Sequence, residues 1–204
     1  MLLQWSAPEY VPRSFLVSGV SGTNKAVKQT DTSFRLTKQV ADGLVDMQEV
    51  SKGLFLVQSE MSFKKETELC EEYPERKVFQ LSFCMNGICE WDYRQKRGEH
   101  YQLSPTQCSL QCGTFSQCVS RFGSEEPYRT LSISLEQERF LPLAEDLEAA
   151  HLIRRDNKIC THIFSTTPEI RLVLQQLLDC PPERKLRKLY LEGKVLELVS
   201  LFCE

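Results

Sequence analysis

The chain has 204 residues, of which 41% are hydrophobic and 26% are charged, values typical of a folded globular protein with its own core. Its net charge of -3 supplies no positive field that would collect nucleic acid, so we expect this chain by itself to bind DNA poorly. No apolar run approaches the roughly 20 residues of a membrane-spanning helix, and residues 1–13 lack the basic start and apolar stretch of a secretory signal. The sequence therefore predicts a cytoplasmic protein that does not interact with membranes.

Cysteine is frequent, with nine residues in the chain. They are Cys70, Cys84, Cys89, Cys108, Cys112, Cys118, Cys160, Cys180 and Cys203. The odd number and the missing secretory signal favour reduced thiols over a disulfide framework. The short spacings, C-x4-C, C-x3-C and C-x5-C, do not match the paired C-x2-C spacing of a zinc site. We expect most of these thiols to be small buried hydrophobic groups, with no cofactor and no metal. A metal or redox sensor built on the five cysteines between 84 and 118 stays open as an alternative.

The first two thirds of the sequence predict β-strands, because short stretches rich in Val, Phe and Leu are bounded by turn-forming residues. Residues 51–62 and 77–85 are two such stretches. In the second, Phe79, Leu81 and Phe83 share one face. The opposite face carries Gln80, Ser82 and Cys84. Asn86-Gly87 then predicts a hairpin turn. Further candidate strands are 99–103, 107–112, 117–122 and 129–135, and this many short strands indicate a sandwich or barrel.

Helical periodicity replaces the strand pattern after residue 135. Apolar residues at i, i+3, i+4 and i+7 predict a short helix over 139–150, with Pro142 in its first turn. Thr166 and Glu169 have the spacing of a capping box, and the helix that follows must stop at the Cys180-Pro-Pro sequence. A second helix is predicted from about residue 183 to the end.

This last helix carries more apolar surface than one neighbour can cover. We expect one arc to form a dimer surface, made by Leu191, Val195, Leu198 and Phe202. The alternatives are that this surface docks a domain absent from this chain, or that both arcs pack onto the barrel and the preceding helix.

The two predicted helices resemble the segment that precedes the DNA-binding domain in AraC-type regulators of the pyochelin-receptor-regulator group. The resemblance rests on Pro168-Glu-Ile-Arg, Leu178-Asp-Cys-Pro and the stretch 187–198, and more loosely on 79–83, Trp91, Tyr101-Gln-Leu and 128–135. It implies an α+β fold: a cupin-like barrel of the double-stranded β-helix or jelly-roll type over 1–138, a short helix and linker over 139–165, and a helical hairpin over 166–204. It also implies a barrel that binds a small-molecule effector, a hairpin that forms a homodimer, and helix-turn-helix units, absent from this chain, that bind DNA.

A cupin metalloenzyme is the main rival, because the same barrel hosts metal-dependent enzymes. Such sites use two or three His ligands, whereas the candidate strands carry only His100, next to Glu99. His151 and His162 fall in the helical and linking region, and no Gly-x-Ser-x-Gly nucleophile sequence occurs. We therefore expect that the protein is not an enzyme and has no catalytic residues.

Effector pockets are mostly apolar with a few polar groups, and barrel mouths commonly hold them. The aromatic residues Phe79, Phe83, Trp91 and Tyr101 are the candidates to line such a pocket. Arg94 or His100 would orient a polar or anionic end of the ligand. The alternative is that these aromatic rings simply fill the barrel. The resemblance implies a ferric siderophore as the specific effector.

Overall fold

The computed structural model describes residues 2–4, 14–17, 29–30, 33–34, 38, 40–94, 98–149, 152–153, 158–181, 183 and 185–203. Its strands are β1 Leu2–Gln4, β2 Ser14–Val17, β3 Gln29–Thr30, β4 Ser33–Phe34, β5 Ala41–Ser51, β6 Leu54–Phe63, β7 Thr67–Asn86, β8 Cys89–Tyr93, β9 Tyr101–Leu103, β10 Gln107–Phe122, β11 Tyr128–Leu135 and β12 Cys160–Ser165. Its helices are α1 Gln137–Phe140, a 3-10 turn at Leu141–Leu143, α2 Ala144–Ala149, α3 Pro168–Leu178 and α4 Arg187–Cys203.

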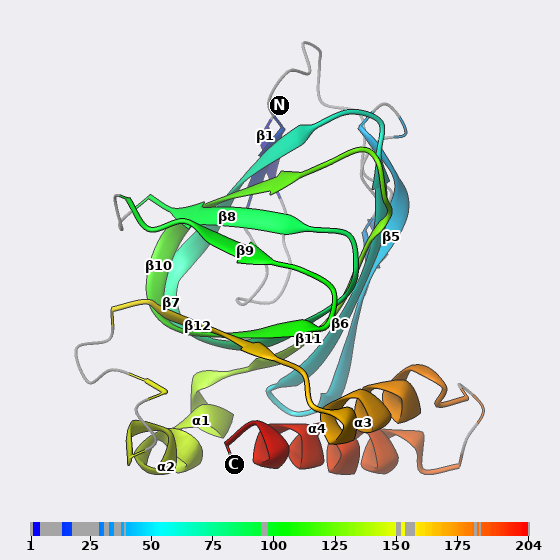
Figure 1. The fold of residues 1–204 in the computed structure, drawn as a ribbon. Coiled ribbons are helices and arrows are strands. Elements are labelled where there is room, and N and C mark those ends of the chain that lie inside the picture. Colours follow the sequence, from blue (N-terminus) through cyan, green and yellow to red (C-terminus); the bar gives the residue numbers. More distant parts are fainter. Residues whose placement is uncertain are drawn as a thin grey trace.

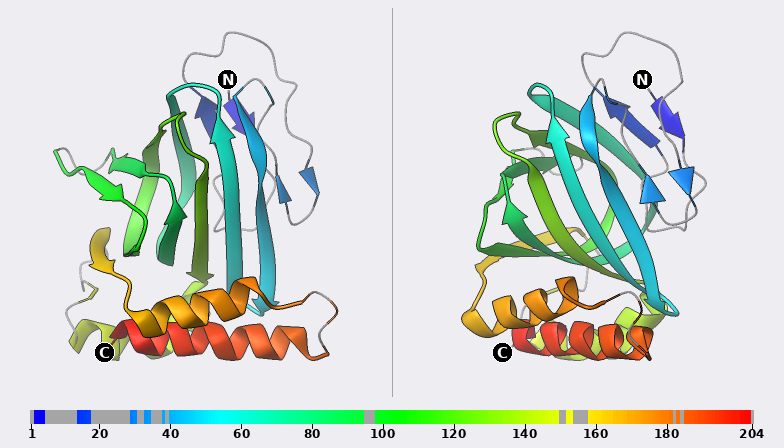
Figure 2. Two further views of the ribbon diagram at one scale, coloured as in Figure 1. Left: turned by 45° about the vertical axis from the view of Figure 1, so that its right-hand side comes forward. Right: turned by 90° about the vertical axis from the view of Figure 1, so that its right-hand side faces the viewer.

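The described strands form one sheet of 12 strands, and every paired strand in it is antiparallel (Figure 1). Its main path runs β3-β4-β5-β6-β11-β7-β10-β8-β9, with β12 added to β10 and β2 to β7. The sheet curls into a barrel, and α3 and α4 lie side by side beneath it, as the two further views in Figure 2 also show. The predicted α+β, cupin-like fold is thereby confirmed.

Two long strands, β7 and β10, connect the walls of the barrel. They pair with each other along one edge, and along its other edge each of them pairs with two further strands. The first half of β10 pairs with β12 and its second half with β8, while both halves pair with β7. The register shifts between Phe115 and Gln117, where the strand bends. The predicted strands 107–112 and 117–122 are therefore parts of a single strand.

Two turn predictions need correction. The predicted strand 51–62 is interrupted at Lys52-Gly53, where Gly53 has a φ of 71° and joins β5 to β6 as a hairpin. The hairpin predicted at Asn86-Gly87 is wrong, because β7 and β8 do not pair with each other; β8 pairs with β10 and β9. Asn86 Nδ2 instead donates a hydrogen bond to the Pro127 carbonyl at 2.6 Å. The turn is a corner at which the chain crosses to another wall of the barrel.

The helices also differ from prediction at their ends. Pro142 lies in the 3-10 turn and splits the predicted helix 139–150 into α1 and α2. Thr167, not Thr166, is the N-cap of α3, and its hydroxyl accepts a hydrogen bond from the Ile170 amide at 3.3 Å. Helix α4 begins at Arg187, four residues later than predicted. None of the helices in the described part of the chain is long and apolar enough to cross a membrane.

The two faces of the sheet bury two separate cores. The helix-facing core lies between the outside of the barrel and the helices, and it includes Leu81, Leu110, Ile133, Val173 and Leu191. The barrel core lies on the inward face, and it includes Met61, Phe63, Trp91, Tyr93, Phe115 and Phe122. Successive residues of a strand alternate between these two cores. The same strands therefore contact both the barrel interior and the helices.

The predicted dimer surface is corrected by this packing. Leu191, Val195 and Leu198 are all 0% exposed and belong to the helix-facing core. Phe202 packs against the same core, with its ring 4.8 Å from that of Phe164. The arc that was expected to meet a second copy thus covers the barrel and α3. The alternative that both arcs are buried in this way is also wrong, because Leu189 and Leu196 of the other arc are exposed.

Candidate functional site

Two rows of polar side chains cross the inward face of the barrel. Register partners on β10, β7 and β11 place Ser109, Ser82 and Ser132 in one row. On β12, β10, β7 and β11, register partners place Thr161, Gln111, Gln80 and Ser134 in the other. Each of these residues alternates with a member of the helix-facing core, such as Leu81 or Leu110. We call these seven residues the polar rows.

Hydrogen bonds connect the polar rows to one another. Ser82 Oγ lies 2.9 Å from Ser132 Oγ and also accepts from Gln80 Nε2 at 3.0 Å. Gln111 Oε1 accepts from the Tyr93 hydroxyl at 2.7 Å. Because Tyr93 projects from β8, this bond joins the rows to the part of the barrel that β8 forms. The serines are buried, whereas Gln80, Gln111 and Thr161 are only half-buried, so solvent reaches part of this face.

Aromatic side chains form the wall next to the polar rows. Trp91 and Tyr101 stack with ring centroids 5.6 Å apart, and Tyr93 lies 4.9 Å from Phe115 and 5.8 Å from Tyr101. Burial raises the pKa of Tyr93 well above its ordinary value, and burial followed by the neighbouring Glu99 raises that of Tyr101 to about 12. Both phenols therefore remain neutral, and Tyr93 acts as a hydrogen-bond donor rather than an anion.

The structure brings together two of the six predicted ligand-binding residues. Trp91 and Tyr101 face the barrel interior, as the ligand-binding prediction required. Phe79 and Phe83 point the other way, into the helix-facing core, because they occupy the alternate positions of β7. Their assignment to the pocket is therefore corrected.

The two predicted orienting groups do not face the interior either. His100 Nδ1 lies 2.8 Å from Asp92 Oδ1, and Asp92 alternates with the inward-facing Trp91 and Tyr93, so this pair is on the outer surface. Arg94 is exposed, just after β8 ends. Sequence reasoning missed Tyr93 and the polar rows instead. The alternation of Gln80 and Ser82 in 77–85 was visible, but nothing in the sequence stated which face turned inward.

Several cysteines of the barrel sit in surroundings that favour the protonated thiol. Burial raises the pKa of Cys84 and of Cys108 to about 11, and it raises that of Cys118 well above the ordinary value. Metal binding and redox chemistry use the thiolate, so these sites favour structural thiols over a metal or redox sensor. Among the residues that the structure describes, no group of three or more His, Cys, Asp or Glu is arranged to hold a metal.

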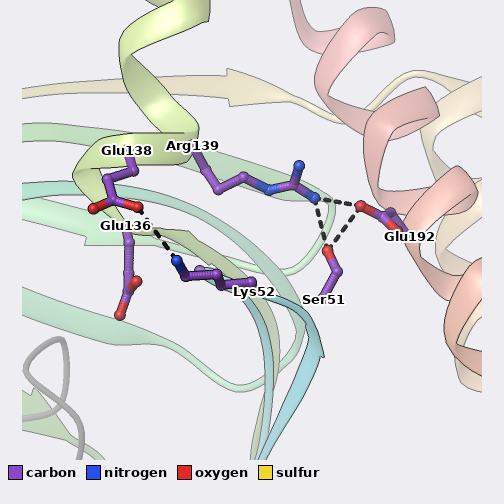
Figure 3. A pocket seen from close by; sticks show the side chains of 7 residues that line it. Ser51, Lys52, Glu136, Glu138, Arg139 and Glu192 are labelled. Atoms are coloured by element: carbon purple, nitrogen blue, oxygen red, sulfur yellow. Dashed lines mark hydrogen bonds and ion pairs between the residues drawn. The ribbon is translucent and has the colours of Figure 1, made fainter.

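A hollow lies between the barrel and the helices (Figure 3). It has a volume of about 360 Å³, and its lining residues are Ser51, Lys52, Gly53, Glu136, Glu138, Arg139 and Glu192. The Arg139 guanidinium of α1 pairs with the Glu192 carboxylate of α4 and donates to Ser51 Oγ at 2.7 Å. Ser51, at the end of β5, in turn donates to Glu192 at 2.8 Å. These three residues, the Arg139 cluster, tie the barrel to both helices.

Comparison with known proteins identifies the family. The family described as the regulatory protein PchR N-terminal domain matches residues 42–204. No curated protein is similar to the chain at a significant level. The solved structure of the AraC-like transcriptional activator CuxR aligns with a TM-score of 0.52 and 8% identity, over 78% of this chain and 56% of that one. An apo form of ToxT from Vibrio cholerae strain SCE256 aligns with a TM-score of 0.50 and 11% identity, over 76% and 56%.

At these identities the structural likeness shows the fold alone, and the chain spans 56% of the length of each of these two proteins. The family match is broader, since residues 42–204 include β5 to β12 and all of the helices. The matched family is described as a regulatory protein domain, and CuxR is described as an AraC-like transcriptional activator. The chain belongs to the family of the regulatory protein PchR N-terminal domain.

Proposed function

We propose that this chain binds a small-molecule effector against the polar rows inside the barrel and passes the binding event on to α3 and α4. One observation carries the proposal: the strands that hold the polar rows also hold the helix-facing core on their other face. Gln80 and Ser82 face inward, while Leu81 between them is fully buried against the helices. A ligand that shifts β7 inside the barrel therefore moves the surface on which the helices rest.

The Arg139 cluster offers a second connection between the two parts. Arg139 and Ser51 both bond to Glu192, which projects from α4. A change in the β5–β6 hairpin would alter the position of α4 through these bonds. Binding energy can shift α4 only if the effector prefers one of two arrangements of barrel and helices.

The family match supports a proposal for the effector and for the output. We propose a ferric siderophore as the first effector to test, and DNA binding through a domain outside this chain, in the cytoplasm. We further propose that the chain is not an enzyme, since its inward polar groups form neutral hydrogen bonds and none of the described ones is arranged as a nucleophile with its base.

The experiment that tests the proposal is a thermal-shift and native mass-spectrometric screen of the purified chain against ferric siderophores and small metabolites. A ligand at 100 times its Kd stabilises the native state by about 2.7 kcal/mol. Hydrogen exchange with the best hit should then show protection on the inward strands and a change in α3 and α4.

A matched pair of variants locates the site. Gln111→Leu should weaken binding because it removes the polar group that meets Tyr93, whereas His100→Ala, on the outer surface, should not. Binding that is lost with His100→Ala and kept with Gln111→Leu would refute an interior site. A metabolite that is consumed during the screen would refute the absence of catalysis.

We also propose a homodimer, formed through the exposed side of α4 rather than through the arc predicted from the sequence. Leu189 and Leu196 of α4 are 64% and 51% exposed and lie seven residues apart on one side of the helix, and Leu186, just before the helix, is 76% exposed. Exposed apolar stripes of this kind mark association surfaces. Sedimentation of Leu189→Glu with Leu196→Glu should show loss of self-association. The exposed Leu172 of α3 supplies the control, since Leu172→Glu should sediment like the wild type.

A further inference from the structure

The indole N–H of Trp91 has no hydrogen-bond partner among the described residues. Trp91 is only 4% exposed, so water does not reach this donor either. Buried tryptophan N–H groups nearly always find an acceptor, because an unsatisfied donor destabilises the folded state. This donor therefore needs an explanation.

The polar groups around Trp91 form hydrogen bonds elsewhere. Burial raises the pKa of Tyr93, and a distorted hydrogen bond from the Trp91 indole lowers it by less. The Tyr93 hydroxyl donates to Gln111 at 2.7 Å, and the indole makes no hydrogen bond of normal geometry with it. Ser120, the register partner of Trp91 on β10, donates to Glu71 at 3.4 Å. The free donor is thus surrounded by groups that do not satisfy it.

Tyr101 covers Trp91 from the side of β9. Its ring stacks on the indole with an interplanar angle of 22°, and its hydroxyl bonds to the exposed Glu99. Strand β9 has only three residues, and in the described part of the chain it pairs with β8 alone. A short edge strand of this kind opens at low free-energy cost, so a ligand can reach the indole by displacing the Tyr101 ring.

We infer that the effector carries a hydrogen-bond acceptor on a planar unsaturated framework, and that Trp91 Nε1 donates to this acceptor while the framework stacks on Trp91 or Tyr101. The inference rests on the proposed effector site inside the barrel and adds the chemical class of ligand and the residue that selects it. The aromatic rings of the wall can stack with a planar ligand, and the acceptor would give the Trp91 indole the well-aligned hydrogen bond that it lacks among the described residues.

Two probes of matched shape test the inference. Acetylnaphthalene has a planar ring system with a carbonyl acceptor, and ethylnaphthalene has the same rings and size without the acceptor. We expect acetylnaphthalene to bind about three- to tenfold more tightly, which corresponds to one neutral hydrogen bond. In a ¹⁵N–¹H spectrum the Trp91 indole peak, identified by its loss in Trp91→Phe, should move downfield with the ketone and not with the hydrocarbon.

Two variants distinguish the contribution of the Trp91 N–H donor from that of the aromatic rings. Trp91→Phe keeps an aromatic ring and should bind both probes equally, while Tyr101→Phe keeps both rings and the indole N–H and should retain the preference for the ketone. Equal affinity of the wild type for the two probes, or an unmoved Trp91 peak with the ketone, would overturn the role of Trp91 and leave the interior site intact. Probes that perturb no inward-facing residue at all would overturn the interior site as well.

Discussion

Ser82 on β7 and Ser132 on β11 are register partners whose hydroxyl oxygens lie 2.9 Å apart inside the barrel. They are 5% and 8% exposed. A buried hydroxyl that loses its partner remains desolvated and unsatisfied, which costs about 1–3 kcal/mol.

This pair gives the first prediction. Ser82→Ala leaves Ser132 without the bond to its partner and should destabilise the chain by about 1–3 kcal/mol in urea unfolding. The double variant with Ser132→Ala removes both hydroxyls and should lose less than the sum of the two single variants. Strictly additive losses would show that the two hydroxyls do not interact.

Glu192 makes the attachment of α4 depend on pH. Hydrogen bonds from Ser51 and then Arg139 hold the pKa of this carboxyl below its ordinary value of 4.5. A group whose pKa is lowered by folding contributes stability above its unfolded pKa, and that contribution is lost as the pH falls through the folded pKa. The free energy of unfolding of the wild type should therefore be larger than that of Glu192→Gln at pH 7. The difference between the two should disappear as the pH falls below the folded pKa of Glu192.

The measurement is the urea midpoint of both proteins across a pH series. Glu197, which pairs with Lys194 on the exposed side of the same helix, provides the control. Glu197→Gln should follow the pH profile of the wild type. A constant difference between wild type and Glu192→Gln at every pH would show that the charge of Glu192 plays no part.

Buried thiols should resist alkylation in the native protein. Cys84 and Cys108 have pKa values raised to about 11 by burial, so at pH 8 they are almost wholly protonated and shielded from the reagent. Brief iodoacetamide treatment followed by peptide mass spectrometry should leave both unlabelled in native protein and label both in urea. Rapid native labelling of either cysteine would revive the redox-sensor alternative.

Two leucines of α4 test the corrected packing. Leu191 is 0% exposed in the helix-facing core, whereas Leu189, two positions earlier, is 64% exposed. Leu191→Ala should destabilise the chain by about 2–5 kcal/mol, and Leu189→Ala by less than about 0.5 kcal/mol, in urea unfolding of dilute protein. Similar losses for both would mean that α4 is rotated relative to the barrel.

Most strands and helices could be predicted from the sequence, because local residue patterns determine where they form. The alternation around Phe79 to Phe83 predicts a strand, and helical spacing with two prolines predicts where α3 ends. The sequence around Asn86-Gly87 did not show which strand β8 would pair with. That partner is β10, which is far away in the sequence and pairs with β8 through Ser120 and Phe122. A local turn preference does not specify which strands meet.

The candidate site was harder to predict for a related reason. A period of two gives the two faces of a strand but not which one turns inward. The sequence predicts Phe79 and Phe83 in the pocket because effector pockets are mostly apolar. In this protein those two residues pack in the helix-facing core, and Gln80 and Ser82 face the barrel interior. The burial of Leu191 against the barrel depends on the same choice of face.

Two glycines provide the last prediction, with effects of opposite sign. Gly193 lies in α4, and a Cβ added there meets nothing within 4 Å. Gly193→Ala should stabilise the chain by about 0.5–1 kcal/mol, because alanine loses less backbone entropy in a helix. Gly113 has a φ of 129°, and a Cβ there would lie 2.5 Å from the Lys158 carbonyl. Gly113→Ala should therefore be destabilising, by about 1–3 kcal/mol from the backbone strain alone.

Thermal unfolding at low and high protein concentration checks both glycine variants. Gly193 lies between Leu189 and Leu196 on the exposed side of α4. If Gly193→Ala stabilises the dilute chain but loses this advantage at high concentration, its added methyl group must crowd a second copy, which supports the proposed dimer. If it destabilises the dilute chain, this side of α4 packs against the chain itself and the proposed dimer surface is wrong.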